Sequence, residues 1–464
     1  MTVLMLLAVC GGLFDVSSVA VEQETAVSFF APLSSEGPAG LFILDGSRLV
    51  VHSVALPETR VIPMEHGTSV VDVFDADGDG ISEVIAVCGK NILRYKIPEQ
   101  GPIPPAETLF TAPSLFSGSV LQPRPHVLAV NYASKVLIAL PCEEHLELRR
   151  LDGTIETQWS VRMAAGQSSP VGPTFSAWTM LAPQIAGRDG LEMRVSRTWE
   201  YAVALPDDLR PPERSTPRFR HVPQIQFLEL SEVDQDRWPW FPLRVDGNGD
   251  ARVLDAPAQP GFKDTLVRIR GEQNASLPGG ARPMKTSPVR RYPGLPALAE
   301  DELPDFDKDG FTDLLLWTSP DPIAGTDALG RILAEGVWPV RVSAHLYRPE
   351  KARYDPRPAS SISLKLPISW FLIPERGTPL RHRVFRDFNG DGRTDCGWSS
   401  RGSRFEAWLF QENGFPKEPS FGLVAPEPIE RVEHCADLDQ KGRTSVVLRT
   451  RRALHVLYAS IPEQ

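Results

Sequence analysis

A nine-residue acidic pattern occurs three times in this chain of 464 residues and constrains its fold more than any other feature. An oxygen side chain stands at positions 1, 3, 5 and 9 and glycine at position 6, in residues 75–83, 305–313 and 387–395. Two carboxylates held about 4–5 Å apart repel by about 3–4 kcal/mol at an effective dielectric of 20. A hard divalent cation turns this repulsion into attraction, and Ca²⁺ takes about 6–8 oxygen ligands. The pattern therefore predicts metal-binding loops, and the alternative is a set of Asp-Gly turns that face water.

The residues after each loop distinguish two calcium architectures. An EF-hand requires a bidentate Glu at loop position 12 and flanking helices. Position 12 is Ala86, Leu316 and Trp398 in the three copies, which excludes the EF-hand. Two loops lead instead into short apolar runs, 84–87 and 314–317, which are typical of buried strands. We therefore expect the loops to join strands.

This combination resembles the FG-GAP/VCBS repeat family, the calcium-loop β-propellers typified by the head domain of integrin α chains. The resemblance implies that each loop joins the first two strands of a blade. It also implies side-chain ligands at positions 1, 3, 5 and 9 and a carbonyl ligand at position 7. The implied Ca²⁺ ligands are Asp75, Asp77, Asp79, Ile81 and Glu83; Asp305, Asp307, Asp309, Phe311 and Asp313; and Asp387, Asn389, Asp391, Arg393 and Asp395.

Weaker copies of the same loop-and-strand unit extend the repeat along the chain. The loops start at residues 75, 131, 185, 246, 305, 387 and 437, and a period of roughly 50–60 residues indicates a repeat architecture. With 44 Pro and 35 Gly, the chain favours many short strands. We predict an all-β fold, a β-propeller of seven four-stranded blades over residues 21–464, with six or eight blades left open. The longest interval is expected to hold an extended loop around 348–358, and in the loop at 437 the ammonium of Lys441 is an alternative to a metal.

Residues 1–20 match a secretory signal peptide, with an apolar run too short to span a bilayer and small residues at 18–20. Lipid attachment at Cys10 and a buried N-terminal segment are the two alternatives. Export predicts a secreted, cell-surface or periplasmic protein with no transmembrane segment in the mature chain. The later cysteines, Cys88, Cys142, Cys396 and Cys435, are either disulfide-bonded or free thiols.

The net charge of −10 and pI near 5.5 argue against a nucleic-acid partner. No common catalytic motif occurs, including G-x-S-x-G, H-E-x-x-H, the P-loop and C-x-x-C. We therefore expect a secreted calcium-binding module that binds or scaffolds an extracellular protein or glycan. Two arginine-rich connections, 210–221 and 282–292, are candidates for an anionic partner. The alternatives are an extracellular polysaccharide lyase or hydrolase, or a sugar-binding lectin, on the same scaffold.

Overall fold

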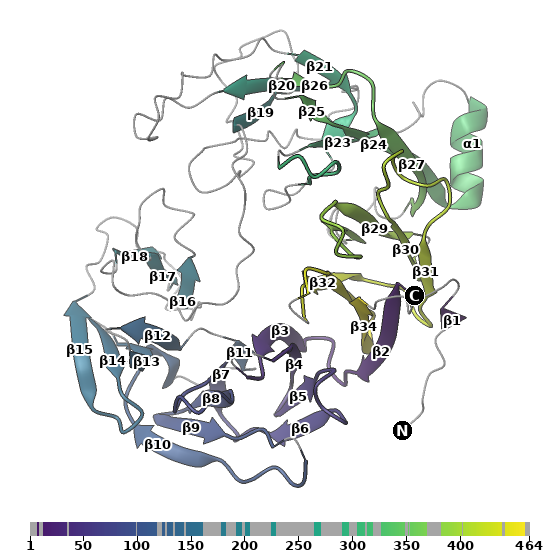
Figure 1. The fold of residues 1–464 in the computed structure, drawn as a ribbon. Helices are drawn as coiled ribbons and strands as arrows, with labels where there is room; N and C mark the ends of the chain where they lie inside the picture. Colours follow the sequence, from purple (N-terminus) through teal and green to yellow (C-terminus); the bar gives the residue numbers. More distant parts are fainter. Residues whose placement is uncertain are drawn as a thin grey trace. The chain divides into compact units, whose positions relative to one another are not determined.

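The computed structural model of the chain forms two compact units, Val21–Pro217 and Met1–Ala20 together with Arg218–Gln464. Strands dominate both units (Figure 1). The structure describes residues 7–8, 13–34, 37–98, 100–117, 123–125, 128–132, 135–142, 145–160, 178–181, 192–196, 200–204, 224–228, 264–270, 290–296, 304–310, 313–318, 326–348, 351, 353–368, 382–400, 402–438 and 441–459.

The unit Val21–Pro217 contains four antiparallel sheets in which strands consecutive in sequence are neighbours. The short strand β11 (Arg124–Pro125) adds to the second of these sheets in parallel with β7, and a 3-10 helix, η1, covers Leu115–Ser117. The sheets consist of β3 (Val27–Pro32), β4 (Ala39–Asp45), β5 (Arg48–His52) and β6 (Arg60–Pro63); β7 (Thr68–Phe74), β8 (Glu83–Cys88), β9 (Asn91–Tyr95) and β10 (Glu107–Thr111); β12 (Ala129–Tyr132), β13 (Lys135–Pro141), β14 (His145–Arg149) and β15 (Ile155–Ser160); and β16 (Trp178–Leu181), β17 (Glu192–Ser196) and β18 (Glu200–Ala204).

The other unit follows the same pattern, and a terminal strand is added to each of its last two sheets. Its sheets consist of β19 (Gln224–Leu228), β20 (Asp264–Arg270) and β21 (Arg290–Pro293); β22 (Leu295–Pro296), β23 (Leu314–Thr318), β24 (Val337–His345) and β27 (Ser360–Pro367); β28 (Arg383–Arg386), β29 (Asp395–Ser400), β30 (Arg404–Trp408) and β31 (Phe421–Val424) with β1 (Leu7–Ala8); and β32 (Arg431–Ala436), β33 (Ser445–Arg449) and β34 (Ala453–Ala459) with β2 (Phe14–Ala20). A hairpin of β25 (Tyr347–Arg348) and β26 (Arg353–Tyr354) and one helix, α1 (Thr326–Glu335), lie between strands of the second of these sheets.

The strand β8, which follows the first acidic loop, is apolar at residues 84–87 because both of its faces are buried. Along β8, Ile85 and Val87 belong to a core shared with β12–β14, whereas Val84 and Ala86 belong to a core shared with β3–β6. Successive side chains of a strand point to opposite faces, so a strand between two packed neighbours needs apolar residues at every position.

The strand topology confirms the predicted fold class, an all-β β-propeller. Five of the seven expected loops, those that start at 75, 131, 305, 387 and 437, start at or between the first two strands of separate sheets. The loops expected at 185 and 246 lie outside the described residues. The spacing of the acidic loops did not predict the sheet β3–β6. Residues 33–38, which join β3 to β4, carry no acidic pattern. It did not predict α1 either, while the expected long loop around 348–358 contains the hairpin of β25 and β26.

The strand β2 lies within residues 1–20, the segment that resembles a signal peptide. It pairs antiparallel with β34 from Phe14↔Ala459 to Ala20↔Ala453, and Figure 1 shows the two strands side by side. Phe14 is 6% exposed and packs edge-to-face against Phe388 and Phe421. Cleavage after Ala20 would therefore remove the outer strand of this sheet.

Three further expectations concern cysteines, membrane spans and basic connections. Cys88, Cys142, Cys396 and Cys435 are free thiols. Within the described parts of the chain, no helix has the length and apolar character needed to cross a bilayer. Cys10 and the basic segment 210–221 lie outside the described residues, as does 282–292 apart from its last residues in β21.

Candidate metal centre

The three acidic loops occupy equivalent places in three sheets. We call residues 75–83 loop A, 305–313 loop B and 387–395 loop C, and we number their positions 1 to 9. Loop A joins β7 to β8, loop B joins β22 to β23 and loop C joins β28 to β29. Residues 437–445, between β32 and β33, form the related loop D.

The first and sixth positions fold the backbone of every loop in the same way. The position-1 carboxylate accepts a hydrogen bond from the glycine N–H at position 6, at 2.9 Å in loops A and B and 2.7 Å in loops C and D. These glycines have φ between +75° and +88°, a region that other residues rarely adopt. Because loop D keeps this turn with Lys441 at position 5, the Asp and Gly of the motif are explained by backbone folding alone.

Position 4 holds a second left-handed residue in loops A, B and C. Gly78 and Gly390 meet this requirement with φ of 80° and 77°, whereas Lys308 adopts φ of 54°. The Lys308 ammonium donates a 2.6 Å hydrogen bond to the carbonyl of Asp391 in loop C. This contact offsets part of the backbone strain at a position that favours glycine.

Position 9 carries a buried acid that holds the loop to the sheet. Asp395 is fully buried; its Oδ2 accepts from the N–H of Phe388 at 2.9 Å and its Oδ1 from that of Phe410 at 2.8 Å. Asp313 makes the equivalent bonds to Phe306 (2.7 Å) and Tyr347 (2.8 Å). Position 9 thus joins the loop to the end of the third strand or the residues after it.

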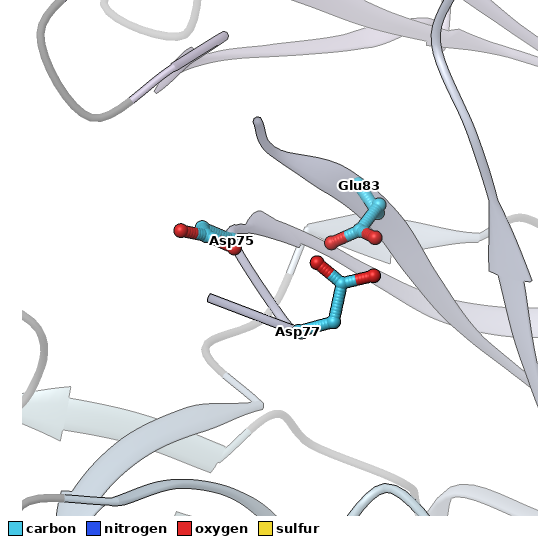
Figure 2. Close-up of side chains that lie close together, drawn as sticks. All are labelled: Asp75, Asp77 and Glu83. Carbon is cyan, nitrogen blue, oxygen red and sulfur yellow. The ribbon is translucent and has the colours of Figure 1, made fainter. Parts of the chain in front are cut away.

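Positions 1, 3 and 9 bring three carboxylates together in two of the loops. One oxygen from each of Asp75, Asp77 and Glu83 lies within 4.8 Å of the others, and the same holds for Asp305, Asp307 and Asp313. Figure 2 shows the carboxylates of Asp77 and Glu83 facing one another, with Asp75 beside them. The position-5 acids, Asp79 and Asp309, are not members of these triads.

Loop C is arranged differently from loops A and B. Its third position is Asn389, whose amide donates to Oδ2 of Asp391 at 3.3 Å. Asp387, Asp391 and Asp395 do not form a comparably close triad. Among the predicted carbonyl ligands, Ile81 and Arg393 are in the described part of the chain and Phe311 is outside it.

The carboxylates at these positions are poorly accommodated as bare anions. Burial, together with neighbouring carboxylates, raises the pKa of Asp395 to about 8 and that of Asp305 to about 6. Burial also raises the pKa of Asp313 well above its ordinary value and that of Glu83 to about 6. Removing a carboxylate from water disfavours its charged form, and nearby like charges act in the same direction. A cation at the triad would reverse both effects.

Loop B fits a cation better than loop A does. Oδ1 of Asp307 is buried without a hydrogen-bond partner, and Oδ2 lies 3.6 Å from Nη1 of Arg348. In loop A, Nη1 of Arg94 lies 3.0 Å from Asp77 and 3.5 Å from Glu83, so a guanidinium already compensates that triad. The hard oxygen donors of loop B suit Ca²⁺ or Mg²⁺ rather than a soft metal.

Adjacent loops are also joined to each other through their backbones, which the sequence analysis missed. The N–H of Thr394, at position 8 of loop C, donates to the carbonyl of Asp305 at position 1 of loop B (2.8 Å). Thr444 of loop D donates likewise to Asp387 of loop C (2.7 Å), and Ser82 of loop A to Leu33 (3.0 Å). The available signal was the Ser or Thr that stands at position 8 in all four loops.

The weaker copies of the loop, at 246 and 437, contribute less to the candidate centre. In loop D the Lys441 side chain is exposed, while Asp439 lies outside the described residues. The weak loop at 246–250 also lies outside them, so its metal ligands stay a prediction.

Comparison with known proteins adds no relative of established function. No family model matches the chain, and no curated protein matches it in sequence. Two similar solved structures are BBS1N in complex with ARL6DN, soaked with mercury (10% identity, TM-score 0.34, 98% of this chain and 97% of that chain), and BamB from Moraxella catarrhalis (10% identity, TM-score 0.34, 98% of each chain). At these values the likeness carries no argument about function.

Proposed function

We propose that the protein is a calcium-stabilised β-propeller that acts as a binding or scaffold module. One observation carries the metal part of this proposal: the buried Oδ1 of Asp307, without a hydrogen-bond partner, beside the carboxylates of Asp305 and Asp313. The resemblance of the three loops to FG-GAP/VCBS repeats supports the same assignment. In loop B the ion would be held by Asp305, Asp307, Asp309, Asp313 and the carbonyl of Phe311.

The proposed ion is structural. It supplies positive charge where three carboxylates lie within 4.8 Å of one another, a separation at which two full charges repel by about 3.5 kcal/mol at an effective dielectric of 20. A ligand that binds only the folded state stabilises it by mass action. Because positions 1 and 6 fold the loop by themselves, the ion is needed for stability and not for the shape of the turn.

Thermal unfolding in EDTA and in calcium tests the metal proposal. We expect calcium to raise the melting temperature of EDTA-treated protein, and Tb³⁺ to show sensitised luminescence that calcium displaces. Magnesium serves as the comparison ion, because it requires a nearly regular octahedral set of ligands and retains its waters. A melting temperature that is the same in EDTA and calcium would contradict structural metal binding.

A location outside the cytoplasm is the second part of the proposal. Loops with Kd of about 10⁻⁴–10⁻³ M are filled only where calcium is about millimolar, as outside cells. Fractionation of the native host with detection of the folded chain tests this location. Intact mass of the recovered protein shows at the same time whether β2 is retained. Recovery in the cytoplasm alone would exclude the extracellular role.

A further inference from the structure

A groove of about 710 Å³ opens between two neighbouring sheets of the unit that contains loops B and C. One wall is formed by β24 and β27 and the other by β30 and residues 417–419. Its volume is in the range of about 300–1,000 Å³ that small-ligand and peptide-fragment sites occupy. None of the acidic-loop residues lines it, so the groove is distinct from the candidate metal centre.

The groove is positively charged although the chain as a whole is acidic. Four cationic side chains line it, against two acidic ones, in a chain of net charge −10. Arg341 and Lys417 are exposed, and among the described residues neither forms an ion pair. Lys365 pairs with Glu335 at 3.2 Å and Arg404 with Glu406 at 2.9 Å. The groove therefore presents two exposed cations, one from each wall, to an anionic ligand, with the acid Glu418 beside Lys417.

A buried donor lies at the same place. Arg404, Glu406 and Trp408 alternate along β30 and so share one face of the strand. Trp408 is 3% exposed, and its indole Nε1 is buried without a hydrogen-bond partner. Because this N–H is closed to solvent, Trp408 lines the groove as an apolar ring and not as a donor to a ligand.

The lining favours a peptide over a sugar. Among the described residues, Trp408 is the one aromatic side chain that lines the groove, and its ring is too buried to stack on a pyranose. The apolar lining residues Pro339, Val340, Leu364 and Pro419 suit aliphatic side chains. Guanidinium groups pair with carboxylates through two parallel hydrogen bonds, which gives geometric specificity for Asp and Glu.

We propose that this groove binds an acidic peptide segment, with Arg341 and Lys417 pairing with its carboxylates. The assignment names the partner class of the binding module proposed above. It does not depend on calcium, so the metal proposal and this one fail separately.

Fluorescence anisotropy with a labelled peptide of alternating Glu and Val tests the proposal, with Gln replacing Glu in the control peptide. We expect the Glu peptide alone to bind, with the same affinity in calcium as in EDTA and more weakly as salt rises. The double variant Arg341→Gln/Lys417→Gln should weaken binding by about tenfold or more. The matched variant Lys90→Gln/Arg357→Gln removes two exposed cations that do not line the groove, and it should bind as the wild type does.

Three outcomes would overturn the proposal. The first is no binding of the Glu peptide to wild-type protein whose folding is verified by its melting curve. The second is equal binding by the two double variants, which would indicate general charge attraction. The third is tighter binding of an oligogalacturonate than of the peptide, lost in Arg341→Gln/Lys417→Gln, which would assign the groove to an acidic glycan.

Discussion

We expect the Asp307→Asn variant to be more stable than the wild type in EDTA and less stable in calcium. The substitution keeps the shape of the side chain and removes one charge from a triad whose oxygens lie within 4.8 Å. Each fully ionised pair at this distance repels by about 3.5 kcal/mol at an effective dielectric of 20. The raised pKa values of Asp305, about 6, and of Asp313 mean that partial protonation already relieves some of this repulsion.

The lost ion pair with Arg348 acts in the opposite direction. Asp307 and Arg348 are separated by 3.6 Å and are both partly exposed, so their pair contributes about 0–1 kcal/mol. We therefore expect a net gain of roughly 1–2 kcal/mol in EDTA. With calcium at about ten to a hundred times Kd, the wild-type loop gains about 1.4–2.7 kcal/mol, and the variant should lose most of this.

Urea unfolding at neutral pH in EDTA and in calcium measures both effects. Asp355→Asn is a matched control, since Asp355 pairs with the same Arg348 at 2.8 Å and is similarly exposed but does not belong to the triad. It should lower stability slightly and equally in both conditions. If Asp307→Asn shifts stability in the same direction with and without calcium, loop B does not bind the ion through Asp307.

Three further predictions concern the loop-to-sheet bonds, the N-terminal strand and pH. In EDTA, Asp395→Ala leaves the N–H groups of Phe388 and Phe410 unpaired and should cost about 2–6 kcal/mol of unfolding free energy. The control Ser445→Ala in loop D removes one acceptor, for the N–H of Ala459, and should cost about 1–3 kcal/mol. Equal losses in urea unfolding would contradict the assignment of two hydrogen bonds to Asp395. Phe14→Ala should cost about 3–5 kcal/mol, because Phe14 is buried against two rings, and an unchanged unfolding midpoint would show that β2 is absent from the folded protein. Burial lowers the pKa of His455 below 6.5, so the folded state binds fewer protons there than the unfolded state. The stability that the neutral ring contributes is therefore lost as pH falls through 6.5, and His455→Asn should lose less of its urea midpoint between pH 7 and 5 than the wild type does. An identical loss in both proteins would show that His455 is not the cause.

The fold class was predictable because the strands after the acidic loops are buried on both faces. A continuous apolar run such as 84–87 fits a strand that is packed between two sheets, which is where the structure places it. The sheet β3–β6 was not predictable by the same route, since its first connection contains Ser34 and Gly37 but no acidic series. The pairing of β2 with β34 was also hidden, because an apolar segment at the start of a chain reads equally as a signal peptide or as a strand.

The candidate site was predictable in its residue types and not in its geometry. Positions 1, 3 and 9 converge in loops A and B, as the motif implies. Arg94 stands eleven residues after Glu83, in β9. The sequence could not show that its guanidinium would contact the carboxylates of loop A, because that contact depends on how β9 pairs with β8. Nor could it show that the Asp at position 1 accepts a hydrogen bond from the Gly at position 6, because the same two residue types occur in simple turns and in metal-binding loops.

The pairing of β2 with β34 also determines when the protein can finish folding. Ser18 and His455, which are hydrogen-bonded across these strands, stand 437 positions apart in the sequence. A ribosome adding roughly 5–20 residues per second therefore needs about 20–90 s to make the chain between these two strands. Throughout synthesis β2 remains an unpaired edge, and such edges are templates for wrong association. The last sheet can therefore form only after β34 has been made, and until then β2 lacks its partner.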